Sequence, residues 1–238
     1  MGIAYNTSIV TDGLVFHLDA ANVRSYSGSG NSAYSLNNNI NLTLNNGVGF
    51  TSTNRGMFAL DGTNDNLTSS NYNIPYVNNS EYTFEAVCKF NTNPNSYQTV
   101  FLYGNSNYEA LVLGKSRSGY ANGGLYGGVY GPGGQAIIAI STTTGAQIVS
   151  LGTLHFTYTL SKPSSVYVAK LYLNGVLETT TTSAVSSYTL GALNTFAIGG
   201  PFTDYVNGNI AMVKVYNKAL TANEVKQNYN AIRDRYGI

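Results

Sequence analysis

Hydrophobic and polar residues alternate along most of the chain in short runs, and glycine or asparagine separates one run from the next. The alternation is clearest at residues 13–19 and 82–90, where every second side chain is apolar. A period of two is typical of a strand with one buried face. The pattern therefore predicts an antiparallel, mostly β protein. Shorter apolar runs predict further strands at residues 57–60, 99–103, 110–113, 136–140, 154–160, 195–199 and 209–216.

The clearest turn signal lies at residues 170–178. Asn174 and Gly175 stand between two apolar runs there. This pair favours a two-residue type I′ turn because both central residues need a positive φ. The segment is therefore expected to be a β-hairpin.

Only the C-terminal end of the chain has the pattern of a helix. Thr221 is a favourable N-cap, and Glu224 stands three residues later, where a capping box needs it. Gly237 is suited to end the helix. An apolar stripe at helical spacing is expected to pack on the β-sheets. Its members are Val225, Tyr229, Ile232 and Tyr236.

Two segments lack a strand pattern. Residues 25–47 are rich in serine and asparagine and are expected to form a long polar loop. Residues 117–135 alternate tyrosine with glycine, and we expect them to lack the bulk needed to pack a core. A single domain at residues 13–238, preceded by an N-terminal arm at residues 1–12, is the expected organisation.

Composition excludes several classes of protein. Only 10% of the residues are charged and the net charge is +1, whereas soluble domains carry roughly a quarter charged residues. Such a chain lacks the basic surface that binds nucleic acid or anionic membranes. No apolar run approaches the roughly 18 residues of a membrane span. Residues 1–6 lack the charged and apolar regions of a secretory signal, so we expect no signal peptide.

Segments spread over nearly the whole chain carry a family resemblance. They are residues 13–22, 25–30, 60–65, 82–86, 171–176, 208–210, 213–220 and 227–231. Together they resemble the concanavalin A-like lectin/glucanase domains of the laminin-G type. The resemblance implies an all-β, two-sheet antiparallel jelly-roll sandwich, here with one short C-terminal α-helix.

The last residues, 235–238, are similar to endings found in structural proteins of tailed phages. This resemblance implies a non-catalytic virion protein, either a capsid decoration protein or a component of the tail or fibre. Its expected partners are other virion proteins and further copies of itself, with host surface glycans as a ligand. The alternatives are a stand-alone carbohydrate-binding adhesin and, less favoured, a glycoside hydrolase.

The acidic residues do not have the spacing of a glycosidase site. Glu81 and Glu85 would lie roughly 13 Å apart on one strand, whereas retaining glycosidases hold two carboxyls about 5–5.5 Å apart. We therefore expect no catalysis. Ala211 and Met212 offer no oxygen side chain where relatives carry acidic residues that hold calcium, so no cofactor is expected.

An oxygen-rich turn follows the run at 57–60. Asp61, Asn64 and Asp65 are weak candidates for a metal site, since hard cations bind such oxygen atoms. The favoured alternative is a turn in which short side chains accept hydrogen bonds from the backbone.

The candidate ligand-binding residues lie in the segment rich in tyrosine and glycine. They are Tyr120, Asn122, Tyr126 and Tyr130. Tyrosine offers an apolar ring face and a hydroxyl that forms hydrogen bonds, which suits contact with a polar ligand such as a glycan. Contact with a neighbouring subunit, or a plain surface loop, remains an equal alternative.

Overall fold

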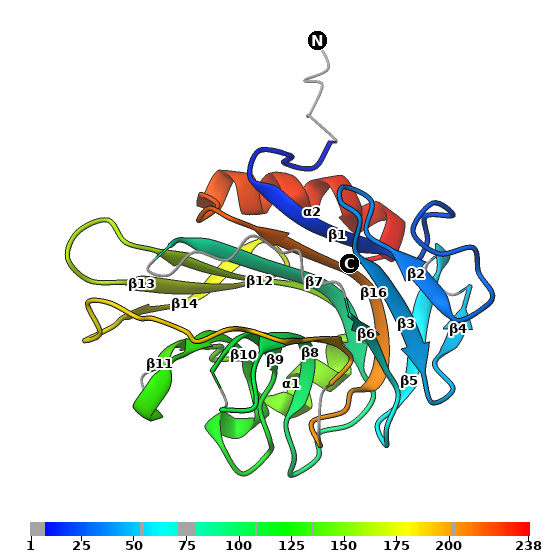
Figure 1. Ribbon diagram of the computed structural model, residues 1–238, viewed down its shortest axis with the longest axis horizontal. Coiled ribbons are helices and arrows are strands. Elements are labelled where there is room, and N and C mark those ends of the chain that lie inside the picture. Colours follow the sequence, from blue (N-terminus) through cyan, green and yellow to red (C-terminus); the bar gives the residue numbers. More distant parts are fainter. Residues whose placement is uncertain (1–7, 53–54, 71–79, 108, 135, 201–202) are drawn as a thin grey trace.

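The structure, a computed structural model, describes residues 8–52, 55–70, 80–107, 109–134, 136–200 and 203–238. Within these residues the strands form two antiparallel sheets that pack face to face (Figure 1). This is the predicted sandwich. The described residues contain no helix that is both long enough and apolar enough to span a membrane.

The first sheet, sheet A, has the strand order β14-β13-β12-β7-β16-β5-β4, and β1 pairs with the second half of β16. The strands of sheet A are β1 (Leu14–Asp19), β4 (Gly49–Thr51), β5 (Met57–Asp61), β7 (Tyr82–Phe90), β12 (Thr153–Ser161), β13 (Val168–Leu173), β14 (Val176–Thr182) and β16 (Asn207–Tyr216). Asn174 and Gly175 both have a positive φ and link β13 to β14, so the predicted hairpin is confirmed.

The second sheet, sheet B, has the order β11-β10-β9-β8-β15-β6-β3-β2. Its strands are β2 (Ser32–Tyr34), β3 (Asn41–Asn45), β6 (Asn66–Ser69), β8 (Gln98–Gly104), β9 (Ala110–Lys115), β10 (Leu125–Tyr130), β11 (Ala136–Ile140) and β15 (Thr195–Ile198). The prediction of a loop at residues 25–47 was wrong in part, because β2 and β3 lie there.

The prediction that residues 117–135 cannot pack a core was also wrong. Strand β10 lies there, between β9 and β11, and buries Leu125 and Val129. Its glycines let the sheets approach each other, since a Cβ on Gly127 would lie 2.4 Å from the Cβ of Tyr158. The Tyr158 hydroxyl crosses the core and donates to the Ile137 carbonyl at 2.8 Å. Glycine in this segment therefore makes room for an aromatic side chain of sheet A.

Helix α2 (Ala222–Tyr236) covers the outer face of sheet A, on the side away from β8, β9 and β10 (Figure 1). Both hydrogen bonds of the predicted capping box between Thr221 and Glu224 are present, and Gly237 ends the helix with a left-handed φ of 68°. The buried stripe includes Asn228, whereas the predicted member Tyr229 is only half-buried. A polar side chain therefore occupies the middle of the helix face that packs on the sheet.

The structure also contains a short helix, α1 (Gly145–Leu151), that was not predicted from the sequence. Thr144 and Gln147 form a capping box at its start, and Ile148 packs in the main core. The helix spans only seven residues, too few to give a clear apolar period. Single-turn 3-10 segments occur at Ala121–Gly123 (η2) and Pro132–Gly134 (η3).

The domain boundary predicted at residue 12 stays a prediction. Residues 1–7 of the predicted arm lie outside the described residues. Residues 8–12 contact the domain, since Gln227 donates to the Ser8 carbonyl at 3.0 Å and Lys218 pairs with Asp12 at 2.7 Å.

Candidate functional site

An open groove of about 550 Å³ lies on the outer face of sheet B. It runs over the outward positions of β8, β9 and β10 and is bounded by the segment before β16. Its lining residues are Tyr97, Thr99, Leu102, Asn105, Ser106, Ala110, Val112, Tyr126, Tyr130, Thr203 and Asp204. The floor is apolar and the walls carry hydroxyl, amide and carboxylate groups, as in many sites for small polar ligands.

Strand register places these side chains together. Tyr126 pairs with Gly114 and Tyr130 with Ala110, so both rings stand beside small residues of β9. A Cβ on Gly114 would lie 3.1 Å from the ring of Tyr126 and 2.6 Å from the Gln98 carbonyl. The glycine therefore leaves the space that the Tyr126 ring occupies.

Three tyrosine rings form a connected cluster at one end of the groove. The Tyr97 and Tyr126 centroids are 5.8 Å apart in an edge-to-face arrangement, and the Tyr97 and Tyr120 centroids are 6.4 Å apart. The Tyr126 hydroxyl lies 3.3 Å from the Thr99 hydroxyl. The guanidinium of Arg117 lies over the Tyr97 ring, 5.8 Å from its centroid. These contacts hold the rings in fixed orientations.

Burial changes the titration of groups in the groove. It raises the pKa of Tyr130 to about 12, and the neighbouring Tyr97, Tyr120 and Asp204 raise it in the same direction. It also raises the pKa of Tyr126 and the pKa of Asp204. At neutral pH the phenols therefore keep their protons and can donate hydrogen bonds.

The structure brings only part of the predicted site together. Tyr126 and Tyr130 line the groove, and Tyr120, 47% exposed, contacts the lining residue Tyr97. Asn122 is exposed in η2 and is not among the lining residues.

Sequence reasoning missed Tyr97, Thr99, Leu102, Val112 and Asp204. A signal in the sequence was available for Val112. The run Ala110-Leu111-Val112-Leu113 is apolar on both faces, which marks an outer face that carries apolar side chains.

The turn after β5 is held by its own acidic side chains. Asp61 Oδ1 accepts hydrogen bonds from the backbone N–H of Thr63 at 2.7 Å and of Asn64 at 3.4 Å. Asp65 Oδ2 accepts from the Asp61 N–H at 3.1 Å. Within the described parts of the chain, no group of three or more His, Cys, Asp or Glu residues is arranged to hold a metal ion. These bonds fit the turn that the sequence favours at this position.

A second polar cluster is buried between α2 and the outer face of sheet A. Glu85 on β7 accepts from Lys214 at 2.8 Å and lies 2.7 Å from His155 Nε2. Its other carboxylate oxygen accepts from Asn228 of α2 at 2.8 Å. All four residues have no exposed surface. Burial by itself raises the pKa of Glu85, but Lys214 and His155 together lower it by more, so the pKa of Glu85 is well below its usual value.

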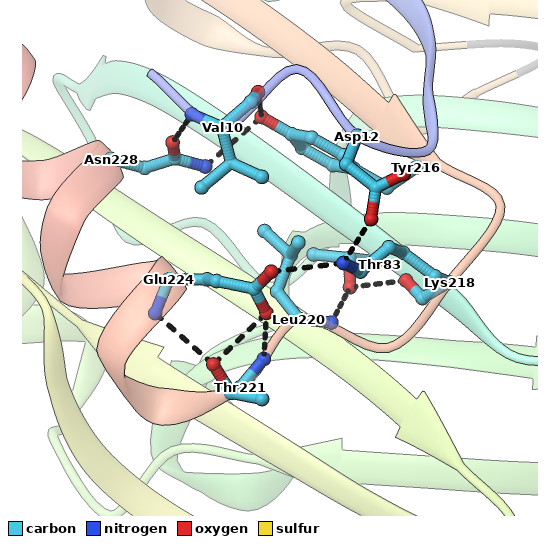
Figure 2. Close-up of polar contacts among 9 residues, drawn as sticks. All are labelled: Val10, Asp12, Thr83, Tyr216, Lys218, Leu220, Thr221, Glu224 and Asn228. Carbon is cyan, nitrogen blue, oxygen red and sulfur yellow. Dashed lines mark hydrogen bonds and ion pairs between the residues drawn. The ribbon is translucent and has the colours of Figure 1, made fainter. Parts of the chain in front are cut away.

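Asn228 links this cluster to the segment before β1 (Figure 2). Its amide oxygen accepts from the Val10 N–H at 2.7 Å, and its amide nitrogen donates to the Tyr216 hydroxyl at 3.0 Å. That hydroxyl donates to the Val10 carbonyl at 3.1 Å. Figure 2 also shows Lys218 between Asp12 and the helix-capping residue Glu224.

The two acidic residues considered for catalysis, Glu81 and Glu85, each accept hydrogen bonds within the protein. Glu85 lies beneath α2, where no sugar can reach it. Glu81 accepts a hydrogen bond from the Lys162 N–H at 2.7 Å. Neither residue faces the groove. The two carboxylates therefore do not form the closely spaced pair that retaining glycosidases use.

Comparisons with known proteins give one family and one fold. The model of the concanavalin A-like lectin/glucanases superfamily matches residues 61–226. The chain is similar to the binding domain of Paraclostridial Mosquitocidal Protein 1, with a TM-score of 0.65, 18% identity, and coverage of 92% of this chain and 52% of that one. No curated protein matches the chain.

Botulinum neurotoxin serotype D supplies two further similar structures. The receptor-binding domain has a TM-score of 0.67 and 15% identity, with coverage of 92% of this chain and 52% of that one. The ligand-binding domain in complex with N-acetylneuraminic acid has a TM-score of 0.64 and 16% identity, with coverage of 92% and 50%. The chain thus spans about half the length of these toxin domains. At such identities the likeness establishes the fold.

Proposed function

The chain belongs to the concanavalin A-like lectin/glucanases superfamily, and from this membership we propose that it is a non-catalytic module that binds carbohydrate in the groove on sheet B. The observation that carries this proposal is the groove itself. It combines an apolar floor at Leu102 and Val112 with the rings and hydroxyls of Tyr97, Tyr126 and Tyr130. A sugar ring has an apolar face and polar edges, and this lining offers a matching surface to both.

The comparisons are consistent with a binding role. The toxin domains that resemble this chain are described as binding or receptor-binding domains, and one was solved with N-acetylneuraminic acid. The superfamily also contains glucanases. Because Glu85 is buried in an ion cluster away from the groove, we expect no release of reducing sugar from any bound polysaccharide.

The test is binding of the purified protein to a printed array of neutral and acidic oligosaccharides. We expect Tyr97→Ala and Tyr130→Ala each to weaken binding about tenfold or more, since aromatic side chains at the centre of a site carry much of its affinity. Tyr34→Ala is the matched control, because Tyr34 is 46% exposed on β2, far along sheet B from the groove. Equal loss in all three variants, or no binding by the unchanged protein, would overturn the proposal.

We also propose that the module is carried on a phage virion, with other virion proteins and further copies of itself as partners. What supports this is the similarity of residues 235–238 to endings of tailed-phage structural proteins. Mass spectrometry of purified particles should detect the protein in multiple copies. Its absence from particles would leave the stand-alone adhesin as the proposed role.

A further inference from the structure

Asp204 is a half-buried carboxylate in the wall of the groove. Its backbone carbonyl accepts a hydrogen bond from the Thr99 N–H at 2.9 Å, which fixes the residue against β8. Burial is the one cause that raises the pKa of its side chain, and within the described residues no hydrogen-bond donor or cation offsets that effect. A carboxylate left in this state can accept hydrogen bonds from a ligand.

The charged side chain that lines the groove is negative, and the charges behind the lining are of both signs. Asp204 is the one charged side chain among the described residues that line it. Behind the lining residue Asn105 lies Glu109, whose carboxylate accepts from Asn105 at 2.9 Å and from the Gly191 N–H at 2.6 Å. The positive charge in contact with the lining is Arg117, which lies over the ring of Tyr97. The buried ammonium of Lys115 is bound to Asn93.

We propose that the groove selects uncharged sugars and rejects anionic ones, such as sialic acids and uronates, with Asp204 as the specificity-determining residue. This inference rests on the proposed carbohydrate-binding function and states which sugars that function serves.

Asp204 acts on the two kinds of sugar in opposite directions. Hydroxyls of a neutral sugar donate to the carboxylate, and hydrogen bonds to a charged acceptor are stronger than those between neutral groups. An anionic sugar places a second negative charge in the same half-buried groove. At a separation of a few ångströms, like charges in such a setting repel strongly enough to weaken binding about tenfold or more.

The experiment compares two matched ligands on the intact protein. The first is the neutral oligosaccharide that binds best on the array, and the second is the same oligosaccharide after its C6 hydroxymethyl group has been oxidised to a carboxylate. Affinities are measured by titration for the unchanged protein, Asp204→Asn and Asp234→Asn. The last is a control, because Asp234 has a 94% exposed side chain on α2. Thermal melts establish that the variants are folded.

We expect the unchanged protein and Asp234→Asn to prefer the neutral ligand about tenfold or more. In Asp204→Asn the preference should fall to within about threefold, because the amide neither repels an anion nor offers a charged acceptor. Equal or better binding of the acidic ligand by the unchanged protein would overturn the inference. If Arg117→Ala then lost this binding of the acidic ligand, Arg117 would be identified as the anion site. An unchanged preference in Asp204→Asn would also overturn the inference.

The outcomes separate the two proposals. Binding of sugars without a preference for the neutral member refutes the role of Asp204 and leaves carbohydrate binding intact. Failure of the unchanged protein to bind any glycan on the array refutes both.

Discussion

The outer faces of the two sheets differ, because a helix covers one of them and the other carries an open groove. Helix α2 covers the outer face of sheet A, and the polar residues beneath it are buried and paired with one another. The outer face of sheet B is open at the groove, where Asp204 has no protein partner among the described residues. The carboxylate of Glu85, on the covered face, therefore has a structural role, whereas the carboxylate of Asp204, on the open face, is available to a ligand.

The covered face shows what burial demands of charged groups. Moving a carboxylate and an ammonium out of water costs several kcal/mol per ion, and that cost is offset only by close pairing and further hydrogen bonds. Glu85 meets this demand with Lys214, His155 and Asn228, which come from three other elements. Such a cluster fixes where α2 docks, since a shift of the helix would leave Glu85 without its amide partner.

The largest expected effect comes from breaking the covered cluster. Glu85→Gln should lower the free energy of unfolding by about 3–5 kcal/mol, because it leaves Lys214 buried without a counter-charge. Urea denaturation followed by circular dichroism measures the change. The control Asp234→Asn should stay within about 0.5 kcal/mol. A loss below about 1 kcal/mol for Glu85→Gln would mean that water reaches the cluster and that the helix does not seal this face.

The unchanged protein and Glu85→Gln should also differ in how the free energy of unfolding depends on pH. The pKa of Glu85 is lowered in the folded protein from its usual 4.5, so its ionised form contributes stability above that value. This contribution is lost as the pH falls below about 4.5 and toward the folded pKa. The stability gap between the unchanged protein and Glu85→Gln should therefore narrow between pH 5 and pH 3. A gap that widens toward acid pH would contradict an ionised Glu85.

A smaller loss is expected from the helix side of the cluster. Asn228→Ala removes the amide that joins Glu85, Tyr216 and Val10 and should cost about 2 kcal/mol, because it leaves buried polar groups unpaired. Hydrogen exchange should show faster opening of the Val10 amide. Asn223→Ala, at an exposed position of the same helix, should change the stability by about 0.5 kcal/mol or less. Equal effects of the two substitutions would remove Asn228 from the docking contact.

The smallest effect is expected on the open face. Asp204→Asn is the same kind of acid-to-amide change as Glu85→Gln, yet it should alter the free energy of unfolding by no more than about 0.5 kcal/mol, because no described partner is lost. Burial raises the pKa of Asp204, so its ionisation disfavours the folded state as the pH rises through that pKa. Urea denaturation at neutral pH should thus show the variant to be as stable as the unchanged protein, or slightly more so. A large loss would reveal a structural role for Asp204.

The pattern of neighbouring residues predicted much of the fold, because interactions between residues close in the sequence decide several of its elements. Strand β7 alternates cleanly, the Asn174-Gly175 turn needs two positive φ angles, and α2 has its capping residues at both ends. Strand β2 has only three residues and β10 is rich in glycine, so neither carries such a pattern, and β3 alternates over only five residues inside a segment rich in asparagine. Their neighbours in sheet B supply the hydrogen bonds that make them strands.

The sequence by itself determined the sandwich, the C-terminal helix, the family and two of the groove tyrosines, Tyr126 and Tyr130. Tertiary structure alone brought Tyr97 and Asp204 to those tyrosines, and it placed Asn228 against Glu85, 143 residues away along the chain. The physical reason is that a strand pattern states which side chains share a face, while strand order and register decide which strands lie side by side. Strand order and register therefore decide which residues make up a site on an outer face.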